Sequence, residues 1–292
     1  MTSAPDLRGP ILAAIDLGDD TKRVVRHAFD LASELSTQLV LLHVLPELFA
    51  VRLLSTPAGF APSLQTEIDA NAADTVRDHI ARLLPEAKSA TVLITHGTAH
   101  GGILDTVERL NPGIVVIGPG RTAQRVARAT TRPLLVTRRS PTGGGVLAAT
   151  DLSDPSFPAI MLGAAEANRR GVRLRVVHCL DIDEKAYVAT SGVAGLMAAY
   201  PLPETLLQQL ATGAREQLTA AMSGVATVSE TVVIRDAAVS GILRAAEQVV
   251  TSLIVVGTRG RTGLTRLALG STAESIVSGA PCSVMVVPLH PA

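Results

Sequence analysis

The sequence predicts an α/β fold made of two tandem domains, each a five-stranded, parallel, doubly wound unit of flavodoxin-like or Rossmann-like type. The chain has 292 residues, a length that suits two domains better than one. Short runs of Val, Ile and Leu alternate with segments of helical periodicity, which is typical of a parallel sheet covered by helices on both faces. The second half of the chain repeats the order of these segments, so the same unit is expected twice.

The repeat is visible in three pairs of similar segments. ILAAIDLGDD (11–20) aligns with VLAATDLSDP (146–155), GILDTVERLNPGIVVIG (102–118) with GILRAAEQVVTSLIVVG (241–257), and RPLLVT (132–137) with CSVMVV (282–287). A linker of arginine, serine, proline and glycine, RRSPTGGG (138–145), lies between the copies. We therefore place one domain at 1–139 and a second at 140–292.

Each copy contributes five expected strands. In the first copy they lie at 11–15, 38–44, 91–95, 114–117 and 133–137, and in the second at 146–150, 173–179, 230–234, 252–256 and 282–287. Helices of the second copy are expected at 156–170, 203–222, 238–249 and 270–279. Two long segments that contain proline, 45–62 and 181–202, follow the second strand of each copy, where a lid or a partner surface is expected.

The closing strands, 133–137 and 282–287, would be sheet edges, and exposed edges favour pairing. We expect them to pair with each other or to lie close together along the domain interface, which would make the chain an intrachain pseudo-dimer. The same edges could instead join two chains, so a homodimer is the alternative.

Composition argues against several classes of function. The 26 basic residues balance the 26 acidic ones and aromatics make up 2%, so nucleic acid would find neither a positive field nor stacking platforms. The sequence contains no run of 18 apolar residues and no basic leader followed by an apolar stretch, so neither a membrane span nor a secretion signal is expected. Cys179 and Cys282 lie in strand-like runs and are expected to be buried thiols of a cytoplasmic protein.

The two copies differ most after the fourth strand. The offset between aligned residues rises from 241 − 102 = 139 to 282 − 132 = 150, so the second copy gains 11 residues there. The first copy reads only GPGRT (118–122), whereas the second reads GTRGRTGLTRLALGST (257–272). Asp151 after the first strand and Gly257 at the end of the fourth are expected to border the crevice in which doubly wound sheets bind ligands.

The longer loop contains groups that favour phosphate. Before Gly270 it holds three glycines and three arginines, Gly257, Gly260, Gly263, Arg259, Arg261 and Arg266. The glycines allow positive φ and close approach of backbone N–H groups to an anion, and the arginines add positive charge. Ser271 and Thr272 follow Gly270 at the start of the last helix, where free N–H groups and the helix dipole favour phosphate. On these features alone, a solvated surface loop ahead of a capped helix explains the sequence about as well.

The spacing Gly257-x2-Gly260-x9-Gly270-Ser271, between a buried strand and a helix, resembles the nucleotide-binding signature of the universal stress protein family. ATDLS (149–153), RVVHCLD (175–181) and APCSVMVV (280–287) fit the same family, and the resemblance covers both repeats. It implies a regulatory protein of the stress response whose second copy holds ATP, with Mg²⁺ or Mn²⁺ on the phosphates.

The resemblance also implies which residues touch the nucleotide. The implied adenosine contacts are Ala149, Thr150, Asp151 and Cys179. The implied contacts to the ribose and α-phosphate are Val256 and Gly257. The implied triphosphate contacts are Arg259, Gly260, Gly270, Ser271, Thr272 and Ala273. An aliphatic slot with one carboxylate and a backbone nest is sufficient for adenine nucleotide, so the scarcity of aromatics is no obstacle.

Two places depart from the expected pattern. RDAA (235–238) stands where the first copy has the glycine turn HGTA (96–99), and we interpret Asp236 as the N-cap of the next helix rather than a ligand contact. In the first copy Asp16 is kept, but Pro119 removes a backbone donor and fixes φ. The first copy is therefore not expected to bind ATP in the way that the second does.

The main alternative function is an ATP-activating or ATP-hydrolysing enzyme of the adenine-nucleotide α-hydrolase type. Such enzymes carry paired glycines after the first strand, and DLSDPS (151–156) has none. Activity would then be at most slow hydrolysis or autophosphorylation at Ser271 or Thr272. A purely structural pairing module is a third possibility.

Four histidines are candidates for chemistry. His43 and His178 occupy matching strand positions and are interpreted as packed core residues rather than catalysts. His96 and His100 stand four residues apart, and we interpret them as solvent-facing turn residues rather than as metal ligands.

Overall fold

The computed structural model describes residues 7–46, 62–181, 203–225, 228–258 and 269–289. In the first repeat the elements are β1 (Ile11–Ile15), α1 (Thr21–Glu34), β2 (Leu39–Leu45), α3 (Pro62–Leu83), a 3₁₀ turn η1 (Pro85–Ala87), β3 (Thr91–His96), α4 (Ala99–Leu110), β4 (Ile114–Ile117), α5 (Arg121–Ala129) and β5 (Leu134–Val136). In the second they are β6 (Gly145–Thr150), a 3₁₀ turn η2 (Asp154–Ser156), α6 (Phe157–Arg170), β7 (Leu174–Cys179), α9 (Glu204–Met222), β8 (Val228–Ile234), α10 (Ala238–Gln248), β9 (Thr251–Gly257), α11 (Ser271–Gly279) and β10 (Ser283–Val287).

Every strand predicted from the sequence is present, and its ends fall within two residues of the predicted ones. The reason is local, since each strand is a short run of β-branched and aliphatic residues between polar, Gly or Pro residues. The expected lid segments, 45–62 and 181–202, lie almost wholly outside the described residues, as does most of the loop after β9.

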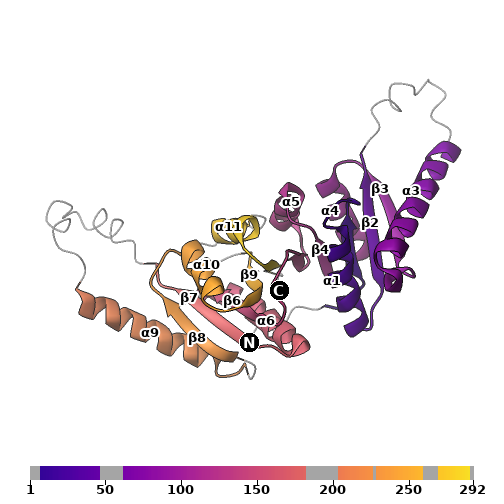
Figure 1. The fold of residues 1–292 in the computed structure, drawn as a ribbon. Coiled ribbons are helices and arrows are strands. Elements are labelled where there is room, and N and C mark those ends of the chain that lie inside the picture. The colour runs from indigo at the N-terminus through magenta and orange to yellow at the C-terminus, as the bar shows by residue number, and fades with distance from the viewer. Residues whose placement is uncertain (1–6, 47–61, 182–202, 226–227, 259–268, 290–292) are drawn as a thin grey trace, which may run out of the picture.

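The ten strands form one sheet in the order β3-β2-β1-β4-β5-β10-β9-β6-β7-β8. Pairs within each repeat are parallel, and the two repeats join through an antiparallel pair, β5 with β10. The predicted pairing of the closing strands is therefore confirmed, and it takes place within one chain. Figure 1 shows the consequence: α3 beside β3 and α9 beside β8 stand at opposite ends of the molecule.

Two aliphatic cores, one on each face of the sheet, run through both repeats. The first lies under α1, α3, α6 and α9 and crosses the junction through Leu135 and Met285. The second lies under α4, α5, α10 and α11 and crosses it through Leu134 and Val284. Because neighbouring strand residues point to opposite faces, this one short ladder supplies both cores at the junction.

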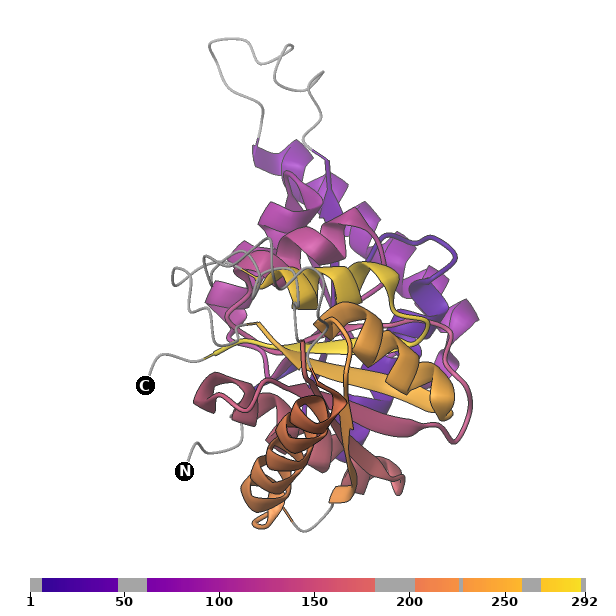
Figure 2. The ribbon, with the colours of Figure 1, turned by 90° about the vertical axis from the view of Figure 1, so that its left-hand side faces the viewer.

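Polar contacts also join the repeats, and each is made between a helix of one repeat and the equivalent helix of the other. The α5 and α11 helices lie side by side in both views of the ribbon (Figures 1 and 2). Between them, Gln124 Nε2 donates to Ser278 Oγ at 3.1 Å. On the other face Arg169 of α6 forms an ion pair with Glu34 of α1. No helix of the described ranges is both long and apolar enough to cross a membrane.

Candidate functional site at the carboxyl ends of the strands

The order of the strands reverses next to the first strand of each repeat. In the second repeat β6 lies between β7 and β9, so the chain leaves β6 and β9 at neighbouring places on the same edge of the sheet. Asp151 follows β6 directly and Gly257 is the last residue of β9. The structure thus brings together the two positions that the sequence placed at the crevice where such sheets bind ligands.

Asp151 is held in a tight turn. Its Oδ1 accepts hydrogen bonds from the backbone N–H of Ser153, at 3.1 Å, and from the Ser153 hydroxyl. Leu152 has a φ of 63°, a left-handed conformation that costs a non-glycine residue about 1 kcal/mol or more. Strain of this kind persists only where the surroundings impose it, so the turn fixes the Asp151 carboxylate at this edge of the sheet.

The Thr150 side chain is part of the scaffold. Its Oγ1 lies 2.7 Å from Ser156 Oγ and accepts a hydrogen bond from the N–H of Leu152 at 3.0 Å. The residue is buried, and its carbonyl oxygen lies 2.9 Å from Nδ1 of His178. The hydroxyl therefore serves mainly to hold the turn after β6.

Ala149, Cys179 and Val256 share the face of the sheet that α10 and α11 cover. They form an aliphatic wall, because the Cys179 thiol stays neutral. Burial raises the pKa of Cys179 to about 11, and the nearby carboxylates of Asp236 and Asp181 add to the shift. Gly241 of α10 packs against this thiol so closely that a Cβ there would lie 2.6 Å from Sγ.

The connection from β9 to α11 is anchored at both described ends. The N–H of Thr258 donates to the carbonyl of Val287 at 3.0 Å, and the N–H of Gly270 donates to the carbonyl of Thr258 at 2.9 Å. Gly257 does not use the positive φ that glycine allows, because it continues the β9 ladder opposite Val287. Gly270 has an ordinary φ of −62°. Glycine at 270 is thus not required by its backbone conformation. Arg259 and Gly260 lie outside the described residues.

The N-terminus of α11 opens at this edge of the sheet. Gly270 is its N-cap residue, and within the described part of the chain no side chain caps the helix. Ser271 is exposed, Thr272 is half-buried and Ala273 is buried against the core. The first-turn N–H groups of an α-helix have no intrahelical acceptor, so this end favours an anion.

Asp236 was predicted to cap α10, and this prediction is wrong by one residue. The N-cap position is Ala237, and no side chain caps the helix there. Asp236 Oδ1 instead accepts from the Ala237 N–H at 2.8 Å and from the Ser240 hydroxyl at 2.9 Å. Its other oxygen pairs with Arg244 at 2.6 Å. Hydrogen bonding from Ser240 is the largest influence lowering the pKa of Asp236, and its charge is neutralised locally.

The first repeat has the same turn but a different crevice. Asp16 Oδ1 accepts from the Gly18 N–H at 2.9 Å, and Leu17 has a φ of 62°. Next to Gly118, however, lies Asp20, whose Cβ would be 3.3 Å from a Cβ at residue 118 and whose carboxylate pairs with Arg23. The connection from Gly118 to α5 is only Pro119 and Gly120.

Three of the four candidate histidines, His43, His178 and His96, have structural contacts. Nδ1 of His43 lies 2.9 Å from the carbonyl oxygen of Ile15, which repeats the contact of His178 with Thr150. His96 Nε2 lies 2.7 Å from Asp69. Among the described residues, no group of three or more His, Cys, Asp and Glu side chains is placed to hold a metal ion.

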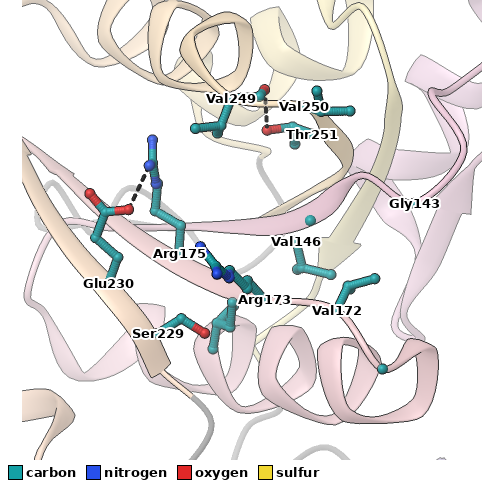
Figure 3. A pocket seen from close by; sticks show the side chains of 13 residues that line it. Gly143, Val146, Val172, Arg173, Arg175, Ser229, Glu230, Val249, Val250 and Thr251 are labelled. Atoms are coloured by element: carbon teal, nitrogen blue, oxygen red, sulfur yellow. Dashed lines mark hydrogen bonds and ion pairs between the residues drawn. The ribbon is translucent and has the colours of Figure 1, made fainter.

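Two hollows that the sequence did not predict lie elsewhere. One, of about 480 Å³, opens at the amino ends of the strands of the second repeat, and Figure 3 shows Arg175 and Glu230 paired beside it, with Val249 and Thr251 across from them. The other, of about 510 Å³, lies where α1, α6 and the linker meet. Their lining residues come from distant parts of the sequence, so no local pattern could have indicated them.

The comparisons with known proteins agree with the repeat. The profile of the Universal stress protein family matches residues 8–138 and again residues 145–288. The chain belongs to this family. Its tandem arrangement follows from the two matches, since each covers one of the two repeats.

Relatives and solved structures of the family support the assignment. The chain is 35% identical over 147 residues to "Universal stress protein A homolog 1" of Coxiella burnetii. The aligned region covers 49% of this chain and 94% of the relative. A Thermus aquaticus universal stress protein is 32% identical over 143 residues, covering 49% of this chain and 96% of the relative. The crystal structure of a universal stress protein from Archaeoglobus fulgidus has the same fold, with a TM-score of 0.66 at 15% identity over 96% of this chain and 98% of its own.

Proposed function

We propose that the second repeat binds an adenine nucleotide, ATP with Mg²⁺ or Mn²⁺ in the first place, and that the chain acts as a nucleotide-responsive regulatory protein. The observation that carries the proposal is the meeting of a fixed carboxylate, Asp151, with the N-terminus of α11 that no described side chain caps. The first group suits a sugar hydroxyl or a base donor, and the second suits a phosphate.

The wall between these two groups suits the base. Ala149, Val256 and the neutral Cys179 thiol are apolar and lie on the same face of the sheet. An apolar slot with a few convergent polar groups is the usual form of a small-molecule site. Backbone donors of residues 259–260 and 271–273, with Arg259 and the Ser271 and Thr272 hydroxyls, would complete a phosphate cradle.

Regulation is favoured over catalysis by the composition of the site. The crevice cysteine is a protonated thiol rather than a thiolate, and the Ser153 hydroxyl that donates to Asp151 belongs to the turn that holds this carboxylate. The crevice lies in the same sheet that joins the repeats, so occupancy can influence the junction through β9 and β10, which pair along their length.

Equilibrium dialysis of the full chain against ATP, AMP and adenosine tests the proposal, with cAMP in the panel because one solved universal stress protein is described as a complex with cAMP. We expect one site per chain. Asp151→Ala should weaken all adenosine ligands by about tenfold or more, since a hydrogen bond to a charged group contributes roughly 1.5–3 kcal/mol.

Asp16→Ala is the matched control, because it removes the equivalent carboxylate from the first repeat. It should leave the affinity unchanged. Two equivalent sites, or equal losses for the two variants, would contradict the assignment to the second repeat.

A further inference from the structure

Five of the eleven residues that line the hollow between the repeats are basic, and four of these are arginines. Arg23 and His27 come from α1, Arg170 from α6, and Arg138 and Arg139 from the linker. The remaining lining is small or apolar, chiefly serine, glycine, proline and Val172. The cavity has a volume of about 510 Å³, which is within the range of small-molecule sites.

The positive charges are only partly balanced. Arg23 pairs with Asp20, and Arg170 pairs with Glu166 at 3.0 Å, although Glu166 is shared with Arg169. Within the described part of the chain, no carboxylate lies at ion-pair distance from Arg138 or Arg139. The cavity therefore carries about two uncompensated positive charges.

Two of the guanidinium groups also hold donors without acceptors. The Nη1 atom of Arg138 and the Nε atom of Arg23 are buried, and neither has a hydrogen-bond partner among the described residues. Leaving a buried charged donor unsatisfied is unfavourable, so such atoms mark a place where an acceptor is missing. The other Arg138 nitrogen, Nη2, donates to the carbonyls of Val277 and Ser278, which fixes the direction of the guanidinium.

The fold itself does not require these cations. With the repeat offsets of 135 and 150, the positions equivalent to Arg23, His27, Arg170, Arg138 and Arg139 are Pro158, Leu162, Leu35, Pro288 and Leu289. None of the five is charged, although the same helices and strands are built there. In addition, Arg23 lies in the first turn of α1, where the helix dipole disfavours a cation.

The electrostatics of the cavity disfavour further positive charge. Burial lowers the pKa of His27, and the charges of Arg170 and Arg23 lower it further, whereas the hydrogen bond with the Arg23 carbonyl and the charge of Asp30 oppose the shift. Burial also lowers the pKa of Arg138, with a contribution from Arg23, while Cys282 opposes the shift. An anion in the cavity would relieve this repulsion.

We propose that this cavity is a second ligand site, for a small anion that carries two or more phosphate charges, held by Arg23, Arg138 and Arg139 at the junction of the two repeats. Guanidinium groups bind phosphate oxygens through pairs of N–H donors, and the unpartnered donors of Arg23 and Arg138 are guanidinium N–H groups. The site is separate from the proposed nucleotide crevice, because its lining reaches β9 at Ser252, near the amino end of that strand, whereas the crevice lies at the carboxyl end, and the two share no residue. A ligand there would touch both repeats and the linker at once.

Isothermal titration of the full chain with inorganic pyrophosphate at low ionic strength tests the proposal. Arg139→Gln is the first variant, since Arg139 is exposed and its replacement removes no described contact. Arg23→Gln/Arg139→Gln is the second. The matched control is Arg125→Gln, which removes an exposed charge from α5 on the other face of the sheet.

We expect the single variant to weaken pyrophosphate several-fold and the double variant at least tenfold, while Arg125→Gln leaves the affinity within a factor of two. Equal affinities for the control and the double variant would overturn the proposal. So would citrate binding as tightly as pyrophosphate, because that would show a general anion site rather than a phosphate site.

Saturating AMP separates this site from the nucleotide crevice. If pyrophosphate affinity is unchanged with AMP present and falls in Arg139→Gln, the junction site stands, whether or not the crevice binds nucleotide. If pyrophosphate is lost on Gly260→Val and not on Arg139→Gln, its phosphates bind in the crevice and the junction site is wrong. Titration of ATP into the wild type and into Arg139→Gln then separates the two sources of phosphate. A lower ATP affinity in the variant shows that nucleotide phosphates occupy the junction, and an unchanged one that free pyrophosphate does.

Discussion

Leu135 and Met285 lie directly opposite each other in the antiparallel ladder between β5 and β10, and both side chains are fully buried. They carry the first aliphatic core from one repeat into the other. Met285→Ala should therefore cost about 2–5 kcal/mol of unfolding free energy, because it leaves a cavity where the two repeats meet. Urea unfolding followed by circular dichroism measures the loss.

Arg128→Gln is the comparison for this prediction. It breaks the ion pair with Glu274, which also joins the repeats but is about half exposed. An exposed pair contributes roughly 0–1 kcal/mol, so the loss should be small. If Arg128→Gln destabilised the chain more than Met285→Ala, polar contacts rather than the shared core would hold the repeats together.

His178→Leu should destabilise the protein without abolishing its fold. His178 is buried and its Nδ1 lies 2.9 Å from the carbonyl oxygen of Thr150, so leucine leaves a buried acceptor without this partner. The expected cost is about 1–3 kcal/mol by chemical denaturation. His43→Leu, at the less buried equivalent position, should cost less, and the reverse order would show that burial of the histidine is not what matters.

Cys282 predicts a loss of stability at alkaline pH. Burial raises the pKa of Cys282 to about 11 from an ordinary value of 9.0, so the unfolded chain releases this proton first as pH rises. The stabilisation from the protonated thiol is complete below about pH 9 and is lost between about pH 9 and 11. The loss of unfolding free energy is about 1 kcal/mol at pH 10. Unfolding of the wild type and Cys282→Ala at pH 8 and pH 10 checks this, since the variant should lose about 1 kcal/mol less over that interval. A parallel decline of the two proteins would contradict it.

The phosphate cradle predicts a dependence on ligand length. Gly260→Val should weaken ATP far more than adenosine, because a β-branched side chain restricts φ and fills space next to the phosphates. Ser271→Ala removes a single hydroxyl and should cost roughly 0.5–1.5 kcal/mol, or about 3 if its partner is a charged oxygen. Dialysis with adenosine, AMP and ATP separates these effects. Equal losses for all three ligands in Gly260→Val would show that residue 260 does not contact phosphate.

Much of the fold could be predicted because its signals are local. The runs at β4 and β9 are continuous aliphatic stretches, and the repeat offsets locate both copies independently of any tertiary contact. The pairing of β5 with β10 followed from the need to cover two edge strands. Backbone conformation was harder. Leu17 and Leu152 adopt positive φ because an aspartate side chain imposes the turn after each first strand, which residue type alone does not indicate. Gly257 and Gly270, in contrast, do not adopt positive φ.

The candidate site was only partly accessible to sequence reasoning. Asp151 and Gly257 were placed correctly at one edge of the sheet, since topology alone decides this. The inward hydroxyl of Thr150 was not foreseen, because it depends on Ser156 one turn later. The cation cluster of Arg23, Arg138 and Arg170 could not be foreseen at all, because only the antiparallel joining of the repeats brings these three residues together.

The most direct test of the account is to delete residues 258–268, which joins Gly257 to Leu269 and Gly270 and makes the second repeat resemble the GPG connection of the first. β9 and α11 remain intact in this variant although the two backbone hydrogen bonds of Thr258 are lost, so it should still unfold cooperatively, at a somewhat lower stability. Titration calorimetry with ATP should give one site per chain in the wild type and no measurable binding in the deletion variant. ATP binding at comparable affinity after the deletion would contradict the central claim that this connection makes the second repeat the nucleotide-binding one.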